Sequence, residues 1–187
     1  VIPFASFVRF SNTMNSYLND SVNTPMDLAA LEQDISGKIV TMRPMEEQNI
    51  QNLLQDPKSI SFWNDHYKIL KHAKNTDYQK SIPFANLQNS FETYQKRVFT
   101  KNSKWLIFIL SKTKLLGALQ PFNIVLYDLG IVINTDLLCG LRENNLAAPD
   151  IKMHSESLDF IFRNDFGFDT LTVNGCFEEQ TKGGFQK

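Results

Sequence analysis

Three histidines and two cysteines are the residues of this sequence that could both bind a metal ion and take part in nucleophilic catalysis. His66, His72, His154, Cys139 and Cys176 are dispersed along the chain, and no pair has the spacing of a zinc motif. A cysteine nucleophile needs a histidine partner, and none is visible for Cys176. We therefore predict no metal site. We expect Cys176 to be a small, buried hydrophobic residue and His154 to have a structural role. The other two histidines are expected to lie on the surface.

Hydrophobic periodicity predicts the elements that would position such side chains. Apolar residues recur at helical spacing from Leu87 to Val98, whereas Trp105–Leu110 is a continuous apolar run typical of a strand buried on both faces. The predicted order is strand, helices, three strands, helix and strand. This order defines an α+β or mixed α/β fold in which a helix crosses between two parallel strands. Strands are predicted over 38–44, 105–110, 129–133 and 170–173, and one more continues over 115–119 and 122–126 across Pro121. Helices are predicted over 46–54, 59–63, 87–98 and from Asp150 to Gly167.

Residues 1–37 are predicted to form a partly helical N-terminal extension in front of a main domain over residues 38–187. The run Thr24–Asp27 (Thr-Pro-Met-Asp) supplies a capping hydroxyl, a proline for the first helical position and an acid for the first turn. Apolar residues follow at helical spacing as far as Ile35, and Gly37 ends the run. We expect this helix to pack on the main domain, with a partner-binding arm as the alternative.

The composition excludes several classes of protein. The chain has 187 residues, 42% of them hydrophobic and 12% aromatic, so it can bury an ordinary core and is not disordered. A formal charge of −1 gives no electropositive field to gather nucleic acid or anionic lipid. The apolar run Trp105–Leu110 is far shorter than the ~20 residues that cross a bilayer. Two cysteines without a disulfide framework indicate a reducing compartment, so we expect an intracellular, cytoplasmic protein.

Several short segments occur in an order that is typical of one family of enzymes. They are Met42-Arg43-Pro44 before an acidic stretch, Asp56-Pro57, Phe62-Trp63, Leu116-Gly117, Leu129–Asn134, Leu158–Phe162, Asn174 and Lys182–Phe185. In order and spacing they resemble the GNAT N-acetyltransferase superfamily. The closest resemblance is to the branch of the ribosomal-protein alanine, polyamine and aminoglycoside acetyltransferases. The resemblance covers about residues 38–187.

The resemblance implies a GNAT-like sheet, mixed and mostly antiparallel, with a splayed parallel strand pair and flanking helices. It also implies that acetyl-CoA binds between the strands at 129–133 and 170–173 and transfers its acetyl group directly to an amine. Main-chain groups of Ile131, Val132 and Ile133 match the strand that holds the thioester carbonyl and its oxyanion. Asn174 matches the asparagine of the family's last helix and is placed with the cofactor-binding residues.

The family holds the pyrophosphate of acetyl-CoA with an Arg/Gln-x-x-Gly-x-Gly/Ala loop at a helix N-terminus, where glycine lets the backbone approach the phosphates. This sequence can be aligned with that loop in two registers, and the motif is incomplete in both. One register retains Gly140; the other retains Arg142 and Ala147, with Asn145 in place of glycine and tolerant of a left-handed conformation. Glu143 opposes phosphate by charge. The residues expected to contact the cofactor here are Gly140, Leu141, Arg142, Asn144, Asn145 and Ala147.

Candidate bases and acids follow from the same resemblance. By analogy, Asp128, Glu178 and Glu179 would lie near the reacting centre and could take the proton of the amine. Acids beside strand ends are usually solvated, and that is the alternative interpretation. The family usually protonates the leaving thiolate with a tyrosine of its last helix, but this sequence has no tyrosine after Tyr127.

We therefore predict an acetyl-CoA-dependent N-acetyltransferase whose acceptor is a protein N-terminus, a lysine or a small amine. The broken loop and the missing tyrosine favour the alternative, an inactive GNAT-fold module for binding or scaffolding. An unrelated α+β domain is the third interpretation. Members of the family continue into two more strands, which are often part of a dimer contact. Residues 38–187 lack these strands, so a homo-oligomer is one possible assembly. Nucleic acid and membranes are not expected partners.

Overall fold

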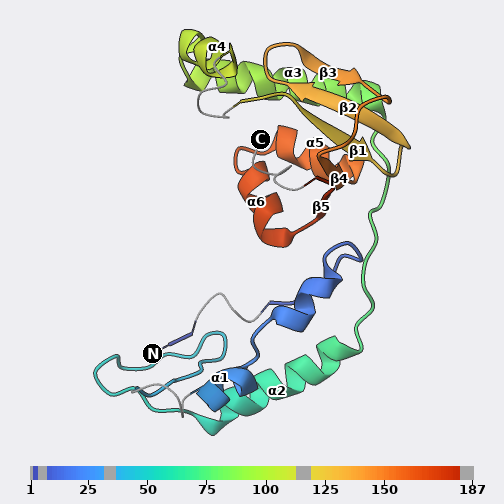
Figure 1. The fold of residues 1–187 in the computed structure, drawn as a ribbon. Coiled ribbons are helices and arrows are strands. Elements are labelled where there is room, and N and C mark those ends of the chain that lie inside the picture. Colours follow the sequence, from blue (N-terminus) through green and yellow to red (C-terminus); the bar gives the residue numbers. More distant parts are fainter. Residues whose placement is uncertain (1, 4–7, 32–36, 113–118, 182–187) are drawn as a thin grey trace. The chain divides into compact units, whose positions relative to one another are not determined.

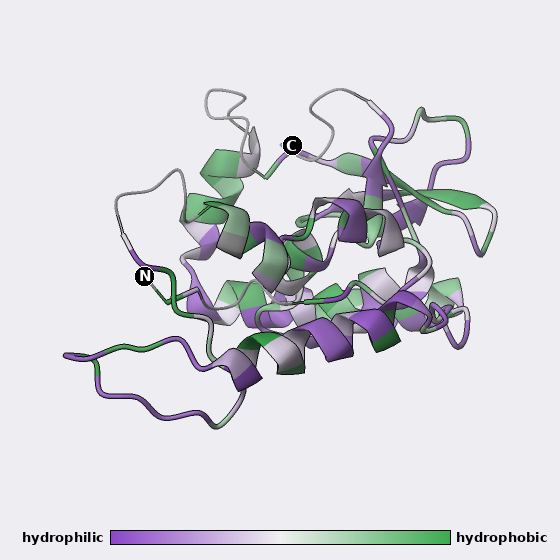
Figure 2. Ribbon diagram, turned by 90° about the horizontal axis from the view of Figure 1, so that it is seen from below, coloured by the Kyte–Doolittle hydropathy of each residue, from purple (hydrophilic) through white to green (hydrophobic). Residues whose placement is uncertain are grey.

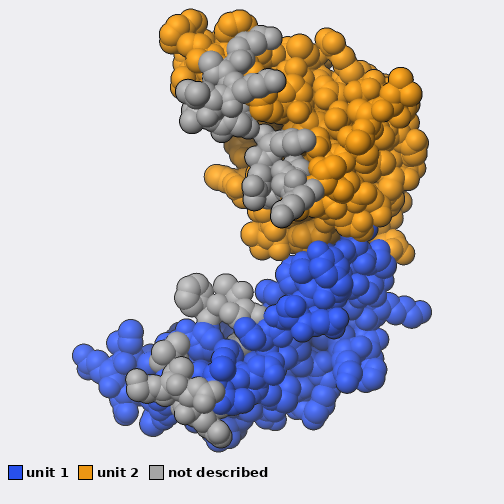
Figure 3. Space-filling model, in the orientation of Figure 1, with its two compact units in different colours: residues 1–76 blue, residues 77–187 orange. Residues whose placement is uncertain are grey.

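The computed structural model describes residues 2–3, 8–31, 37–112 and 119–181. The chain forms two compact units, residues 1–76 and residues 77–187 (Figure 3). The division predicted between residues 37 and 38 lies inside the first unit. The segments that resemble the GNAT superfamily are therefore distributed over both units.

The first unit contains the 3-10 helix η1 (Ser16–Ser21) and the helices α1 (Pro25–Leu31) and α2 (Pro57–Lys71) (Figure 1). The predicted start of α1 is confirmed. The Thr24 hydroxyl and N–H donate to the Asp27 carboxylate at 2.6 and 2.7 Å, and the Asp27 N–H donates to the Thr24 hydroxyl at 3.3 Å. This reciprocal cap satisfies N–H groups that a helix start leaves unpaired. The predicted continuation to Ile35 lies outside the described residues.

The strand and the helix predicted within residues 38–54 are both wrong, because the segment forms neither element. The backbone of Thr41 pairs with the side-chain amide of Gln55 instead of a neighbouring strand, with hydrogen bonds of 2.7 and 3.0 Å. Glu46 accepts a hydrogen bond of 3.0 Å from the Arg43 N–H through its own carboxylate. Such bonds between side chain and backbone compete with regular secondary structure.

Asp56 and Pro57 begin α2. The Asp56 carboxylate accepts from the Lys58 N–H at 2.9 Å, and Pro57 occupies a position whose N–H would be unpaired in any case. The helical turn predicted over residues 59–63 lies within α2.

The second unit is a mixed α+β fold built on an open sheet, which confirms the predicted fold class. The strand order is β3-β2-β1-β4-β5, and every neighbouring pair is antiparallel except β1 and β4, which are parallel. The parallel pair was predicted between other segments, 129–133 and 170–173. The strands are β1 (Phe122–Leu126), β2 (Ile131–Asp136), β3 (Gly140–Glu143), β4 (Ile151–Met153) and β5 (Phe177–Glu179).

The helices of the second unit are α3 (Phe84–Lys101), α4 (Lys104–Lys112), α5 (Ser155–Arg163) and α6 (Gly167–Asn174). α3 confirms the helix predicted from Leu87 to Val98, and it packs against α5 and β3. The rings of Phe91 on α3 and Phe162 on α5 lie 5.0 Å apart. β1 and β2 bring hydrophobic residues such as Ile124 into the core, and the hydrophobic stretches of the chain are green in Figure 2.

The strand predicted over residues 105–110 is wrong, because these residues form most of α4. Ile107 is buried, whereas Trp105 and Phe108 are exposed, so only one side of the run is covered by the protein. A short apolar run does not by itself distinguish a strand from a helix. Most of the first part of the strand predicted next, over 115–119, lies outside the described residues.

The region after residue 149 also departs from the prediction. The helix expected to begin at Asp150 begins at Ser155, because β4 comes first. Residues 170–173 belong to α6 rather than to a strand, and Gly175 ends α6 in a left-handed conformation with φ 64°. Gly167, expected to end the first of these helices, begins the second.

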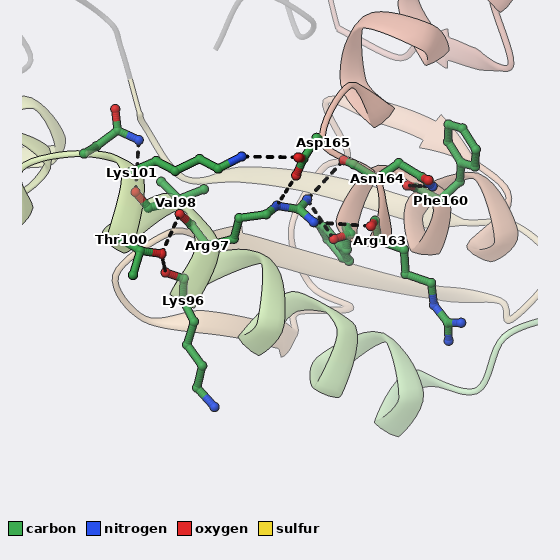
Figure 4. Close-up of polar contacts among 11 residues, drawn as sticks. Lys96, Arg97, Val98, Thr100, Lys101, Phe160, Arg163, Asn164 and Asp165 are labelled. Carbon is green, nitrogen blue, oxygen red and sulfur yellow. Dashed lines mark hydrogen bonds and ion pairs between the residues drawn. The ribbon is translucent and has the colours of Figure 1, made fainter.

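Arg97 connects α3 to the C-terminal end of α5. Its guanidinium donates to the backbone carbonyls of Phe162, Arg163 and Asn164 at 3.0–3.2 Å and pairs with Asp165 at 3.1 Å (Figure 4). Carbonyls at the end of a helix have no partner within it, and a cation there also interacts favourably with the helix dipole. Arg97 therefore stabilises the packing of the two helices.

We expect Arg97→Met to lower the free energy of unfolding of the chain by roughly 2 kcal/mol, because three carbonyls lose a charged donor. Lys101→Met is the matched control. Its ammonium pairs with the same Asp165 at 3.2 Å but is more exposed, so a loss of less than about 1 kcal/mol is expected. Urea unfolding followed by circular dichroism measures both. Equal losses for the two variants would contradict the role given to Arg97.

Candidate functional site

The carboxyl ends of the parallel strands β1 and β4 meet at one edge of the sheet. The last residues of the two strands are paired in register, so Tyr127-Asp128 and His154-Ser155 leave the strands side by side. In sheets with parallel strands, ligands commonly bind beyond such carboxyl ends. These four residues are the starting point of the candidate site.

Asp128 is the buried centre of this region, with only 7% of its side chain exposed. Its carboxylate accepts hydrogen bonds from the N–H and hydroxyl of Ser155, at 2.9 and 2.5 Å. Burial acts to raise the pKa of Asp128, but the hydrogen bonds from Ser155 and Ser81 outweigh it, so the pKa lies below the usual 3.8. Asp128 is therefore an anion that is fully engaged by its neighbours.

His154 forms the N-cap of α5 with its imidazole ring. Its Nδ1 accepts a hydrogen bond of 3.1 Å from the Glu156 N–H. In a neutral ring with Nδ1 as acceptor, the hydrogen lies on Nε2, which is 3.5 Å from Asp128 Oδ2. Both ring nitrogens are used at the helix start, so His154 is a positioning group and not a general base. The structural role predicted for His154 agrees with this geometry.

A tyrosine from a distant part of the chain completes the buried layer. The ring of Tyr78 stacks on His154 with centroids 3.9 Å apart, and its hydroxyl shares a hydrogen bond of 2.6 Å with Ser157. Burial raises the pKa of both Tyr78 and the neighbouring Cys176 thiol, so both groups keep their protons at neutral pH. Cys176 is thus a buried neutral thiol, as predicted.

Tyr127, Lys152 and Glu178 form a more accessible layer near the carboxyl ends of β1 and β4. The Tyr127 ring meets the edge of His154, and 38% of the residue is exposed. Lys152 Nζ lies 5.5 Å from the centre of the Tyr127 ring and 3.1 Å from Glu178 Oε2. Burial, together with the negative charge of Asp128, raises the pKa of Tyr127 to about 12. The structure therefore brings both candidate bases, Asp128 and Glu178, into the surroundings of Tyr127.

The strand register explains this grouping. Lys152 lies opposite Val125 of β1 on one side and opposite Glu178 of β5 on the other. Side chains two residues apart along a strand point to the same face, which brings Tyr127 to the face of Lys152 and Glu178. Glu179 alternates to the opposite face, beside the buried Ile151. The arrangement offers a proton donor, a carboxylate and an ammonium group on one face.

The predicted oxyanion donors lie elsewhere, in the interior of the sheet. Ile131, Val132 and Ile133 belong to β2, which is paired on one side with β1 and on the other with β3. The Val132 N–H donates to the Asn145 side chain at 2.8 Å, and its carbonyl accepts from the Asn144 N–H at 2.8 Å. The main chain at Val132 is therefore already hydrogen-bonded within the protein.

The predicted phosphate loop is a strand followed by a turn. Gly140, Leu141 and Arg142 lie in β3 at the edge of the described sheet. The Ala147 N–H donates back to the carbonyl of Asn144 at 3.0 Å. Gly140 has φ 89°, but Asn145 is not in a left-handed conformation, contrary to its expected role as a substitute for glycine.

The helix N-terminus expected to face this loop is also used internally. The first N–H groups of α5 donate to Asp128 and to His154, so the protein supplies its own anion at that position. Asn174, the remaining cofactor candidate, is the last residue of α6, and its side chain accepts from the Cys176 N–H at 3.0 Å. The aromatic pair Phe62-Trp63 lies on α2 in the first unit, and Leu116-Gly117 and Lys182–Phe185 lie outside the described residues.

Tyr78 and Lys152 belong to the site but were not predicted from the sequence. Tyr78 lies 79 positions from its partner Ser157, and no local sequence pattern predicts a contact between residues so far apart in the chain. Lys152 could have been found had β4 been recognised, because alternation within Ile151–Met153 places Lys152 on the opposite face from its buried neighbours.

Comparisons with known proteins add no relative. No protein-family model matches the chain, and no curated protein or solved structure is significantly similar to it. The resemblance to the GNAT superfamily therefore depends on the sequence segments named above alone.

Two further findings concern the part of the chain that the structure describes. None of its helices is both long enough and apolar enough to cross a membrane. It also contains no group of three or more histidine, cysteine, aspartate and glutamate side chains arranged to hold a metal ion.

Proposed function

We propose that this protein is an acetyl-CoA-dependent N-acetyltransferase that acts on an amine, and that Tyr127 and Glu178 carry its proton transfers. The observation that supports the proposal most strongly is Lys152, which connects the Tyr127 ring and the Glu178 carboxylate at the end of the parallel strand pair. The resemblance of residues 38–187 to the GNAT superfamily supplies the reaction class. The free thiols of Cys139 and Cys176 support the cytoplasmic location included in this proposal.

In the proposed reaction the amine nitrogen attacks the thioester carbonyl, a C–N bond forms and the C–S bond breaks. Glu178 accepts the proton that the amine loses. Tyr127, whose pKa of about 12 keeps it protonated, donates its hydroxyl proton to the departing thiolate. Proton transfer through solvent from Glu178 to Tyr127 restores both groups. Tyr127 thereby takes the role for which the sequence after it offers no tyrosine.

The cofactor site is the less complete part of the proposal. The backbone N–H groups of Val132 and Ala147 and those that begin α5 are used within the protein, so they form no cradle for a pyrophosphate. We assign the diphosphate to the exposed side chain of Arg142 instead. The same observation favours the second candidate function, a module that binds or scaffolds without turnover.

Release of free thiol from acetyl-CoA, with spermidine or an alanyl peptide as acceptor, tests the proposed activity. We expect Tyr127→Phe and Glu178→Gln each to lower kcat by about 100-fold, the usual size of a lost acid or base. Glu179→Gln is the matched control and should change kcat less than about twofold, because Glu179 lies on the other face. Absence of both thiol release and binding heat at millimolar acetyl-CoA, with folded protein, would leave the scaffold function.

A further inference from the structure

The first unit contains a cavity of about 750 Å³ that the acetyltransferase proposal does not use. It lies among α2, η1, the start of α1 and the segment around Val8, all within residues 8–75. Small-molecule sites typically measure about 300–1,000 Å³, so the volume suits a small organic ligand. The chemistry of its lining indicates which kind.

One face of α2 supplies the polar part of the lining. Asn64, Tyr67, Lys68 and Lys71 all line the cavity, and they follow one another at the spacings i, i+3, i+4 and i+7. Residues at these spacings lie on the same side of a helix. An amide, a phenol and two ammonium groups therefore form a row along one wall of the cavity.

Asn64 has an unmet requirement for a hydrogen-bond donor. Its Oδ1 is buried, and no described residue donates a hydrogen bond to it. A buried acceptor without a donor destabilises a protein, so native structures rarely retain one without a reason. Oδ1 itself is closed to solvent, but Asn64 lines the cavity, so a half-turn of its carboxamide would bring Oδ1 to a ligand that carries an N–H or O–H group.

The charged side chains of the lining favour an anion. Arg9, Lys68 and Lys71 contribute three positive charges, and Asp20 contributes one negative charge. Arg9 is engaged by the Ala73 carbonyl and Asn75, and Lys68 pairs with Asp65 at 3.3 Å. Lys71 has no acidic partner among the described residues, so it is the cation best placed to meet a ligand carboxylate.

The remaining wall is apolar. Val8, Val22, Met26 and Leu70 line the cavity together with the polar row. Val8 and Met26 keep 45% and 49% of their surface exposed, which an apolar ligand could cover. Putting these features together, we propose that this cavity binds a small amphipathic carboxylate that carries an N–H donor beside an apolar chain.

The test uses the full-length chain and two probes that differ in one group. N-octanoylglycine has an apolar chain, an amide N–H and a carboxylate, whereas octanoyloxyacetate replaces the N–H by an ester oxygen. Isothermal titration should show that N-octanoylglycine binds at least about tenfold more tightly, because only it can donate to Asn64. Equal affinities, or no binding of N-octanoylglycine at millimolar concentration, would overturn the proposal.

Two lysine variants of α2 test the charge. Lys71→Gln should weaken the binding of N-octanoylglycine at least about fivefold, since it removes the ammonium group that faces the carboxylate. Lys58→Gln, on the same helix but outside the lining, should leave the affinity within about twofold. Equal effects of the two variants would show that general charge, and not this cavity, attracts the anion. Acetyltransferase activity is not part of either readout, so failure here leaves the proposed function untouched.

Discussion

Gly167→Ala is expected to lower the free energy of unfolding of the second unit by about 3 kcal/mol or more. A Cβ at this position would lie 2.6 Å from the Ile161 Cα and 2.8 Å from the carbonyl oxygens of Ile161 and Phe160. These atoms belong to the backbone of α5, which cannot move aside as a flexible side chain could. Overpacking usually costs 1–3 kcal/mol, and a backbone clash falls at the upper end or beyond.

Two other glycines provide controls for this prediction. Of the described atoms, none lies within 4 Å of a Cβ built on Gly37 or Gly140. Gly37→Ala should therefore be neutral, and Gly140→Ala should cost only about 1 kcal/mol because its φ of 89° strains an L-residue. Thermal unfolding of the three variants measures the order. A Gly167→Ala protein as stable as the Gly37→Ala protein would show that α5 and α6 do not approach so closely.

Gly167 also shows why the sequence predicted only part of the second unit. A glycine after an amphipathic stretch is a common helix end, so the sequence predicts that a helix ends there. Gly167 must be small because the start of α6 lies directly against the backbone of α5. The local sequence pattern does not indicate this requirement. That requirement comes from residues that meet only in the folded protein.

The elements predicted correctly carry their signals within the element itself. Thr24 and Asp27 are three residues apart and form the predicted cap, and Leu87 to Val98 show a helical period on their own. The apolar run Trp105–Leu110 has no such period. Its identity as part of α4 depends on what covers it, and the sequence alone does not contain that information.

The candidate site follows the same rule. Asp128 and Glu178 were named as possible bases by analogy, and both lie beside Tyr127 in the structure. The cofactor loop was inferred from a motif that needs a helix directly after it, yet β4 precedes α5. Recognising three-residue strands such as β4 and β5 from sequence is difficult, because so few side chains show the alternation.

Asp128→Asn is expected to destabilise the chain by about 3 kcal/mol at neutral pH. The substitution removes the negative charge from a buried group and turns an N–H₂ toward donors of Ser155. Removing one partner of a buried, hydrogen-bonded charge typically costs 3–5 kcal/mol, and the remaining amide oxygen recovers part of this. Asp65→Asn, in the exposed pair with Lys68, is the control and should cost less than about 0.5 kcal/mol.

The pH dependence distinguishes the charge of Asp128 from its shape. Because its pKa in the folded protein lies below the ordinary 3.8, the unfolded chain binds the proton more readily, and stability rises with pH across that range. The stabilisation by Asp128 is complete above the unfolded pKa of about 3.9 and is lost as the pH falls through the folded pKa. Urea unfolding from pH 7 to pH 2.5 should therefore show the gap between wild type and Asp128→Asn constant above about pH 5 and shrinking below about pH 4. A gap that persists unchanged at the lowest pH would mean that Asp128 stabilises α5 through hydrogen bonding alone and that its charge contributes nothing.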